Sequence, residues 1–589
     1  MPAEELLRSI AKKTEESEYY TPIPDGYRLG QTKYIIITGS VMSGLGKGIF
    51  SASLGKLLGD SGFACSPIKF DGYLNVDAGT LNPYRHGEVF VLDDGTESDM
   101  DLGTYERFLD KNISKENYLT GGKIFTAVLG KERSGKYLGR DVQFIPHVTG
   151  EIKGFLRELA LKTKADIVLV EVGGTVGDIE NQYFIEAMRQ LAYEEGRENT
   201  CFVNVTYVIK PEFLGEQKSK PAQMGIKALM ELGIQPDIIA CRSKNPVTQK
   251  VREKISIYSN VPLQNVVSVH DMESIYTVPT LLKEAQIDRI VCERLGLKNG
   301  KKAESKEWVQ FVDNLTHPKR EITIGMTGKY TGLRDSYASI LMALEHAGAK
   351  TQTKISIRWI EVTEIETGKI TVEEALKGLA GVIVPGGFGK RGTEGKIACI
   401  KYLRENKIPY LGLCFGFQMA LIEFARNVCG LKDANSTEIE PDCKYQVIDI
   451  LPEQKKIEGL GGNMRLGGRD VEIKKGTMAH KLYGSLKVRE RFRHRYECNP
   501  EYIGTFEKKG IVFSGKAPDY PIMQILELPG HPFFVGTQFH PEFTSRPLSP
   551  NPLYVAFVEA AIRQGQMHGK NKGNSEKSAK VEAKLKKRV

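Results

Sequence analysis

The chain has 589 residues, of which 41% are hydrophobic and 26% charged, as is ordinary for a globular protein, and its length predicts two to four domains. No run approaches the roughly 20 apolar residues that a bilayer-spanning helix needs, so we expect no membrane segment. The nine cysteines are scattered and never form a CxxC pair, which argues against a disulfide framework or a zinc site and indicates a reducing cytoplasm.

The formal charge of +9 is concentrated at the C-terminal end. Residues 570–589 contain eight basic and two acidic side chains, so the rest of the chain carries only about +3. The segment is polar and lacks aromatic residues, which favours a solvated tail over a nucleic-acid-binding arm. We therefore expect no nucleic acid among the partners.

Apolar runs that alternate with helical segments predict two successive α/β domains with parallel sheets, the first of the P-loop type and the second carrying a reactive cysteine. In the first half the expected strands are Tyr34–Thr38, Ser66–Phe70, Ile167–Val172, Phe202–Ile209, Ile238–Cys241 and Val266–Val269. In the second half they are Ile322–Thr327, Ile355–Ile360, Gly381–Val384 and Tyr410–Cys414. The expected boundaries are an N-terminal extension over 1–31, a first domain over 32–297, a linker over 298–320, a second domain over 321–567 and a tail over 568–589.

A glycine-rich loop follows the first strand. The segment Gly39–Gly48 lies between that strand and a helical stretch, where backbone N–H groups and the positive helix end can bind phosphate oxygens. Lys47 would reach the outer phosphates. The match to a Walker A loop is imperfect, because Gly48 stands where a metal-binding Ser or Thr is expected. Magnesium would therefore need carboxylates from elsewhere in the chain.

Acidic residues that could supply those carboxylates occur in two places. Asp99 and Asp101 lie in an acidic loop, and Glu171 ends a buried strand, where side chains face the ligand crevice of an open α/β sheet. Any one of these acids alone is more simply a solvated loop residue. A basic cluster at Lys218–Gln223, with Lys254 further on, is suited to triphosphates, although such clusters are also common on solvated surfaces.

Cys414 carries the strongest signal of the second half. Gly412 and Gly416 flank it in a G-x-C-x-G pattern at a strand-to-helix turn, the thiol version of a nucleophile elbow. The N-terminus of the following helix favours a thiolate. A cysteine in such a turn is by itself more often structural, but His540 and Glu542 complete a Cys-His-Glu triad and reverse that balance.

Taken together, these segments resemble the CTP synthase family, glutamine-dependent amidoligases that convert UTP to CTP. The resemblance covers about residues 32–565 and depends on the order of many motifs. In the first half these are Ser43–Gly48, Lys69–Asp77, His86–Val91, Asp101–Gly103, Glu171–Glu180 and Lys218–Gln223. In the second half they are Pro385–Gly389, the Cys414 elbow, Ala434–Glu438, Met464–Gly467 and Arg493–Glu497.

The resemblance implies a role for each matching position in the first half. The residues that it assigns to ATP are Gly44, Leu45, Gly46, Lys47, Gly48, Ile49, Lys69, Asp101, Asp271 and Met272. Those assigned to UTP, and to CTP as feedback inhibitor, are Ser43, Asp178, Ile179, Glu180, Lys218, Ser219, Lys220, Pro221, Ala222, Gln223 and Lys254. The resemblance further implies that Asp101 and Glu171 hold Mg²⁺.

In the second half the resemblance implies a glutaminase that works through Cys414, His540 and Glu542. The residues that it assigns to glutamine are Gly387, Phe415, Gly416, Phe417, Gln418, Glu438 and Arg495. It also implies an ammonia tunnel gated near His86 and Val89, a lid at Gly461–Gly467 with Arg465 through which GTP activates, a homotetramer and filament formation.

The chain departs from the usual family pattern at several positions. Ser40, Met42 and Gly44 replace Gly, Val and Ser in the phosphate loop, and the missing hydroxyl at the third position removes one phosphate contact. Asn463 replaces Thr in the lid, which puts the GTP response in doubt. Phe415 and Phe417 replace Leu and Met, a change that concerns packing more than chemistry.

Two other classes of protein remain as alternatives. One is a glutamine amidotransferase that acts on a different nucleotide or on a cofactor precursor, but the lysines of Lys218–Gln223 and Lys254 argue against a different acceptor. The other is a P-loop scaffold with an idle glutaminase half. Nothing in the sequence supports that degeneration, because Lys47 and the three triad residues are all present.

Overall fold

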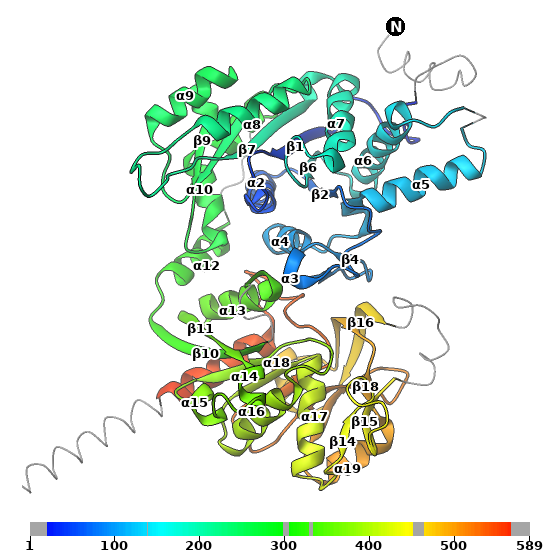
Figure 1. Ribbon diagram of the computed structural model, residues 1–589, viewed down its shortest axis with the longest axis vertical. Coiled ribbons are helices and arrows are strands. Elements are labelled where there is room, and N and C mark those ends of the chain that lie inside the picture. Colours follow the sequence, from blue (N-terminus) through cyan, green and yellow to red (C-terminus); the bar gives the residue numbers. More distant parts are fainter. Residues whose placement is uncertain (1–19, 138–139, 299–304, 329–333, 451–463, 567–589) are drawn as a thin grey trace, which may run out of the picture. The chain divides into compact units, whose positions relative to one another are not determined.

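The computed structural model describes residues 20–137, 140–298, 305–328, 334–450 and 464–566, and the contacts between residues divide the chain into two compact units (Figure 1). The first unit comprises Met1–Thr80 and Asp101–Val309, and the second comprises Leu81–Met100 and Gln310–Val589. The predicted α/β class is confirmed, because each unit contains a sheet with a parallel core and connecting helices. The predicted domain boundaries stay predictions.

The first unit contains a seven-stranded sheet in which every neighbouring pair is parallel. In spatial order its strands are β5 (Tyr118–Thr120), β2 (Cys65–Asp71), β6 (Ile167–Val172), β1 (Lys33–Gly39), β7 (Thr200–Tyr207), β8 (Ile238–Ser243) and β9 (Val266–His270). All six strands expected from the apolar runs are present. The short edge strand β5 was not expected, since its three residues carry no pattern of their own.

Side chains on β1 explain why the runs are apolar throughout. Ile36 belongs to one hydrophobic core and Ile35 and Ile37 belong to another. Successive residues of a strand point to opposite faces, so the sheet needs a core on each side. The helices that connect its strands and cover its faces are α2 (Lys47–Asp60), α4 (Met100–Leu109), α5 (Gly121–Arg133), α6 (Thr149–Thr163), α7 (Gln182–Glu195), α8 (Lys220–Glu231), α9 (Gln249–Ser259), α10 (Val278–Glu284) and α11 (Ile287–Arg294).

The described part of the N-terminal extension, residues 20–31, packs against the first unit. Tyr27 is buried, and its hydroxyl lies 2.7 Å from that of Tyr34 on β1 and donates to Glu195 at 3.0 Å. Residues 1–19, residues 299–304 of the predicted linker and the whole predicted tail, 568–589, fall outside the described residues. After residue 304 the chain continues as helix α12 (Lys306–Thr316), where the sequence predicted linker.

The second unit contains a nine-stranded sheet. Its strands in spatial order are β11 (Thr353–Glu361), β10 (Arg320–Gly328), β12 (Gly381–Val384), β13 (Tyr410–Leu413), β21 (Phe534–Thr537), β20 (Met523–Glu527), β19 (Val512–Lys516), β16 (Arg465–Ile473) and β17 (Lys487–His494). The first five are parallel and the rest pair antiparallel. Smaller sheets pair β14 (Ala434–Ser436), β15 (Tyr445–Asp449) and β18 (Glu497–Cys498), and β3 (Phe90–Val91) with β4 (Glu97–Ser98).

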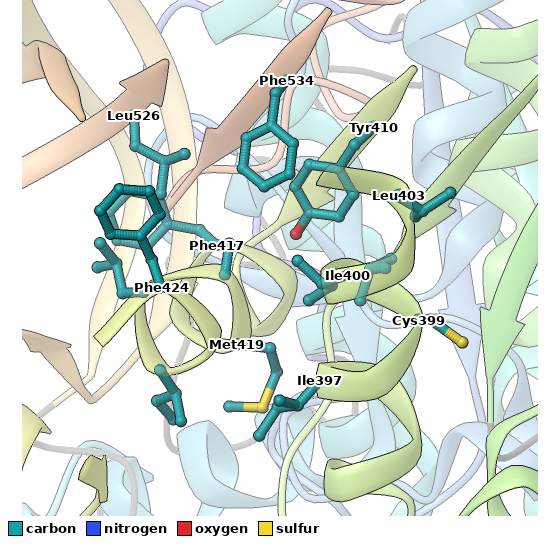
Figure 2. Packing of buried hydrophobic residues seen from close by; sticks show 14 of the residues in the cluster. Ile397, Cys399, Ile400, Leu403, Tyr410, Phe417, Met419, Phe424, Leu526 and Phe534 are labelled. Atoms are coloured by element: carbon teal, nitrogen blue, oxygen red, sulfur yellow. The ribbon is translucent and has the colours of Figure 1, made fainter. Parts of the chain in front are cut away.

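The second unit also contains helices among its described residues. They are α3 (Pro83–His86), α13 (Ala338–Lys350), α14 (Val362–Glu366), α15 (Val372–Leu376), α16 (Thr393–Glu405), α17 (Phe415–Asn427), α18 (Met478–Tyr483), α19 (Ile503–Lys508) and a final helix over 552–566. Figure 2 shows the core in which Ile397 of α16 lies beside Met419 of α17. The ring of Tyr410 on β13 stacks on Phe534 of β21, with centroids 4.4 Å apart. This packing fixes the β13–α17 turn that carries Cys414.

The described residues contain no helix that is both long and apolar enough to cross a membrane.

Candidate active sites

Cys414 occupies a strained turn between β13 and α17. Its φ of 48° and ψ of −97° lie outside the regions that side chains favour, which is the geometry of a nucleophile elbow. Gly416 is required there, because a Cβ on it would lie 2.1 Å from the carbonyl oxygen of Val384. The first N–H groups of α17 have no partners within the helix, so they present donors and positive potential beside the sulfur. The predicted elbow is therefore present in the backbone.

The predicted triad residues lie next to one another, with His540 between Cys414 and Glu542 in the chain of contacts. His540 Nδ1 is 2.7 Å from Glu542 Oε1, and both side chains are buried. Burial lowers the pKa of His540, but the Glu542 carboxylate and the Cys414 side chain outweigh it and raise the pKa to about 10. A histidine beside a cysteine and oriented by a carboxylate is the arrangement that nucleophilic catalysis by a thiol requires.

Two further groups, which we did not predict from the sequence, contact the Cys414 sulfur. Gln538 Nε2 donates to Cys414 Sγ at 3.6 Å, and the sulfur lies 3.7 Å from the carbonyl oxygen of Arg493 on β17. Gln538 stands two residues before His540, so the alternation of an extended segment was a usable signal. Arg493 had no such signal, because its contact is made by the backbone.

A cavity of about 420 Å³ opens in front of Cys414. Of the residues predicted to bind glutamine, Gly387, Gln418, Glu438 and Arg495 line it. The Glu438 carboxylate also accepts a hydrogen bond of 2.8 Å from the N–H of Gly389. The other polar and aromatic side chains that line the cavity include those of Glu88, Tyr337, Phe388, Lys396, Arg493, His494, Tyr496 and Phe543.

Three predicted glutamine contacts are arranged differently. Phe417 is fully buried in the core of Figure 2 and does not line the cavity. Phe415 begins α17, and its ring lies 4.9 Å from Lys396 Nζ. Gly416 has no side chain to contribute. Phe415 and Gly416 can therefore contribute backbone N–H groups to glutamine binding.

The predicted gate and lid residues also lie in the second unit. Val89 lines the cavity, and His86 ends α3. Arg465 pairs with the buried Glu497 at 2.9 Å. The rest of the predicted lid, apart from Met464–Gly467, falls outside the described residues, Asn463 included.

The phosphate loop of the first unit joins β1 to α2 at the carboxyl edge of the parallel sheet. Gly44 and Gly46 have φ values of 72° and 79°, which glycine adopts without strain. The Lys47 side chain lies over Gly39, and a Cβ on Gly39 would come within 2.9 Å of Lys47 Nζ. Lys47 Nζ donates to the carbonyl oxygen of Gly174 at 2.7 Å. Burial lowers the pKa of Lys47, against the attraction of the Glu171 carboxylate.

Asp101 and Glu171 are joined by one lysine, although they come from α4 and β6. Lys69 Nζ lies 3.0 Å from Glu171 Oε1 and also pairs with Asp101. Burial raises the pKa of Glu171, although Lys69 opposes that effect. A Cβ at Gly48 would lie 2.2 Å from Asp101 Oδ1, so glycine is needed where a Walker A loop has Ser or Thr.

These carboxylates fit a magnesium ion that is shared with a nucleotide. Within the residues that the structure describes, no group of three or more His, Cys, Asp or Glu side chains could hold a metal by itself. Mg²⁺ commonly uses one or two carboxylates and completes its coordination with water and substrate phosphates. Asp101 and Glu171 next to the phosphate loop meet that requirement.

The predicted UTP and CTP residues come from loops and from helices α8 and α9. Gly225 of α8 packs on the phosphate loop, since a Cβ on it would come within 2.6 Å of Ser40 Cβ. Ser219 accepts from Gln223 at 3.0 Å at the start of α8. The hydrogen bond from Lys218 lowers the pKa of Glu216, and the charge of Lys254 on α9 lowers it further.

The remaining predicted nucleotide contacts follow strands of the same sheet. The Asp178 carboxylate accepts from the N–H of Thr175 at 2.8 Å, and Ile179 is 79% exposed. Asp271 follows β9 and pairs with Arg242 at 2.7 Å. Met272 next to it is exposed. Because carboxyl ends of parallel strands share one edge, the structure brings these segments to the side of the sheet that carries the phosphate loop.

Two known protein families match the chain, one in each half. The family described as CTP synthase N-terminus matches residues 33–297, and the family described as Glutamine amidotransferase class-I matches residues 333–560. The CTP synthases of Thermococcus gammatolerans and Pyrococcus horikoshii are 52% and 54% identical to the chain over 531 residues, which is 90% of this chain and 98% of each relative. The solved Trypanosoma brucei CTPS glutaminase domain with bound acivicin is 37% identical, with a TM-score of 0.39, over 41% of this chain and 94% of that chain.

The fold and the two sites define a glutamine-dependent ligase with a class I glutamine amidotransferase domain. The chain belongs to the CTP synthase family, whose members hydrolyse glutamine and form CTP from UTP. ATP is the co-substrate of that family.

Proposed function

We propose that this chain couples two reactions, the phosphorylation of UTP in the first unit and the hydrolysis of glutamine in the second. The observation that carries the proposal is the Cys414–His540–Glu542 triad on a strained elbow. The same chain also carries a phosphate loop next to a lysine-bridged carboxylate pair. Neither site alone would explain the presence of the other.

In the glutaminase reaction, Cys414 attacks the carbonyl carbon of the glutamine side-chain amide. The proton held by His540 passes to the leaving nitrogen, ammonia departs, and a γ-glutamyl thioester remains until water hydrolyses it. Glu542 keeps Nδ1 of His540 protonated and oriented. The N–H groups of Gly387 and Phe415 are the proposed oxyanion hole, and Glu438 and Arg495 bind the amino and carboxylate ends of glutamine.

In the synthase reaction, the uracil O4 of UTP accepts the γ-phosphoryl group of ATP, and ammonia then displaces phosphate at C4. Gly44–Ile49 cradle the phosphates of ATP through backbone N–H groups, while Lys47 and Lys69 neutralise the charge that develops during transfer. Asp101 and Glu171 would hold Mg²⁺, which supplies further neutralisation of the phosphates. Ser43, Lys218–Gln223 and Lys254 would bind UTP through charge and hydroxyl contacts.

The proposal extends to regulation and assembly. We infer that CTP competes at the UTP site with its base toward Asp178–Glu180, that GTP activates through the lid that includes Arg465, and that ammonia passes from Cys414 by way of His86 and Val89. A homotetramer, filaments and a cytoplasmic location are part of the same proposal.

The direct test is CTP formation from UTP, Mg-ATP, glutamine and GTP, with nucleotides separated by chromatography. CTP should appear together with ADP, phosphate and glutamate. Glutamate without CTP would leave the glutaminase assignment standing and refute UTP as the acceptor. CTP without glutamate would refute glutamine hydrolysis at Cys414 as the source of the nitrogen.

A further inference from the structure

A short hairpin from the first hundred residues belongs to the second unit and packs against strand β17. We define hairpin 88–98 as residues 88–98, which include β3 and β4. The ion pairs Asp93–Arg489 at 2.9 Å and Glu97–Arg493 at 2.7 Å hold it to β17. Between them, Arg491 Nη1 donates to the Val91 carbonyl at 3.1 Å. Since alternate residues of a strand share a face, the three arginines form one row.

The strand that hairpin 88–98 grips also touches both reactive residues. The carbonyl oxygen of Arg491 accepts a hydrogen bond of 2.8 Å from the N–H of His540. The carbonyl oxygen of Arg493 lies 3.7 Å from Cys414 Sγ. Arg491 and Arg493 therefore bind the hairpin through their side chains, and their backbone carbonyls contact His540 and Cys414.

A second connection runs through aromatic rings. Phe90 is fully buried, and its ring meets that of Phe543 edge to face, with centroids 5.1 Å apart and planes at 68°. Phe543 in turn stacks on the imidazole of His540 at 4.9 Å and 18°. The Arg491 guanidinium covers Phe90 at 5.5 Å, so that the ring is enclosed. Phe90 thus fixes the surface on which the imidazole rests.

We propose that Phe90 is a positioning residue for His540, acting through Phe543, and that hairpin 88–98 is a structural part of the glutaminase site. The hairpin lies outside residues 333–560, the part of the chain that matches the glutamine amidotransferase family. Its other end supports the same wall: Glu88 accepts from the N–H of Ser339 at 2.8 Å, and Val89 lines the cavity. The inference rests on the proposed function of Cys414 and His540.

The test uses the full chain with Phe90→Leu and Phe90→Ala. Leucine keeps most of the apolar volume but lacks the ring edge, so we expect kcat for glutamine hydrolysis to fall about two- to tenfold. Alanine also lets Phe543 move and should cost about tenfold or more. KM for glutamine should stay within about twofold, because Phe90 is not among the residues that line the cavity. Ammonia-dependent CTP formation should be unchanged.

The matched control is Phe506→Leu in α19. Phe506 is equally buried and pairs with Phe424 at 6.4 Å, but it does not line the cavity. If Phe90→Ala fails to fold, Phe90→Leu against Phe506→Leu still decides the matter. Equal kcat values in wild type and Phe90→Leu, or equal losses in Phe90→Leu and Phe506→Leu, would overturn the proposal.

A separate readout distinguishes failure of this inference from failure of the proposed function. Alkylation of Cys414 by iodoacetamide, mapped by mass spectrometry, needs no glutamine turnover. We expect it to slow in Phe90→Leu and Phe90→Ala toward the rate of His540→Ala. If wild type hydrolyses no glutamine but this order of alkylation rates holds, the proposed function is wrong and the positioning role stands. Wild-type alkylation rates in both Phe90 variants would refute the positioning role.

Discussion

Individual residues at the two sites are constrained by very short distances. Cys414 holds a strained backbone conformation, a Cβ at Gly416 would meet the backbone of Val384, and a Cβ at Gly48 would meet the carboxylate of Asp101. The sequence identified Cys414, His540 and Glu542 from spacing alone. It could not explain Gly48, because its partner Asp101 lies 53 positions away and only the fold brings them together.

Gly48→Ala is expected to lower the rate of CTP formation by about a hundredfold or more, with glutamine and with ammonia alike. The added Cβ would meet the Asp101 carboxylate at 2.2 Å and displace the proposed magnesium ligand. Gly59→Ala in the same helix is the control, because nothing lies within 4 Å of its Cβ and alanine stabilises a helix by about 1 kcal/mol. Steady-state CTP formation with each nitrogen source measures the effect, and wild-type turnover in Gly48→Ala would contradict the assignment.

The His540–Glu542 pair should stabilise the folded state in a defined pH window. The folded pKa of His540 is raised from 6.5 to about 10. Its contribution is therefore complete below pH 6.5 and is lost as the pH rises through about 10. The melting temperature of Glu542→Gln should fall below that of wild type at low pH, and the two should converge toward pH 10.

The exposed pair His317–Asp313 provides the control for that measurement. Both side chains are more than half exposed, so Asp313→Asn should change the melting temperature little at any pH. A gap between wild type and Glu542→Gln that widens as the pH rises would contradict the sign of the His540 shift.

At the scale of elements, strands were more predictable than their partners. The ten apolar runs correspond to β1, β2, β6, β7, β8, β9, β10, β11, β12 and β13. Most of these strands are buried on both faces and leave a continuous signal, whereas β11 at the sheet edge is only partly buried. Strands β16 and β17 gave no such signal, because Arg489, Arg491 and Arg493 alternate with buried residues. Hairpin 88–98 was equally hidden, because its contacts join residues about four hundred positions apart.

The described extension, residues 20–31, caps a buried charge cluster at α6 and α7. Arg157 is fully buried and pairs with Glu195 at 2.8 Å and Glu194 at 2.7 Å, and it also donates to the Pro22 carbonyl at 3.2 Å. The sequence treated 1–31 as peripheral, because charges and tyrosines give no periodic pattern. These contacts make its described part integral to the first unit.

Arg157→Met should destabilise the first unit by about 3–5 kcal/mol, because it leaves the buried Glu195 carboxylate without its cation, whereas Glu194 keeps its pair with Lys153 at 2.6 Å. Hydrogen exchange of β1 peptides, followed by mass spectrometry, reports on this unit alone and should speed up by about a hundredfold or more. Arg189→Met is the matched control, since its pair with Glu186 is 45% exposed on the arginine side and contributes about 0–1 kcal/mol. Equal exchange in both variants would show that the cluster does not stabilise the unit.

At the scale of the whole molecule, the order of motifs predicted the family and the pairing of two α/β units. It did not predict that Leu81–Met100 would belong to the second unit, since chain order places that segment between two strands of the first. The segment ends at Met100, directly before the proposed magnesium ligand Asp101. A covalent connection of a few residues therefore links the surroundings of the two candidate sites.

The proposed function requires two separable sites, and Cys414→Ala tests that requirement most directly. CTP formation should be measured with glutamine and with ammonia, with Cys399→Ala as the control, because burial raises the pKa of the Cys399 thiol to about 12 and removes it from chemistry. Glutamine-dependent synthesis should fall by about a thousandfold or more in Cys414→Ala, while ammonia-dependent synthesis stays within about twofold of wild type. Equal loss with both nitrogen sources, or retained synthesis from glutamine, would contradict the account.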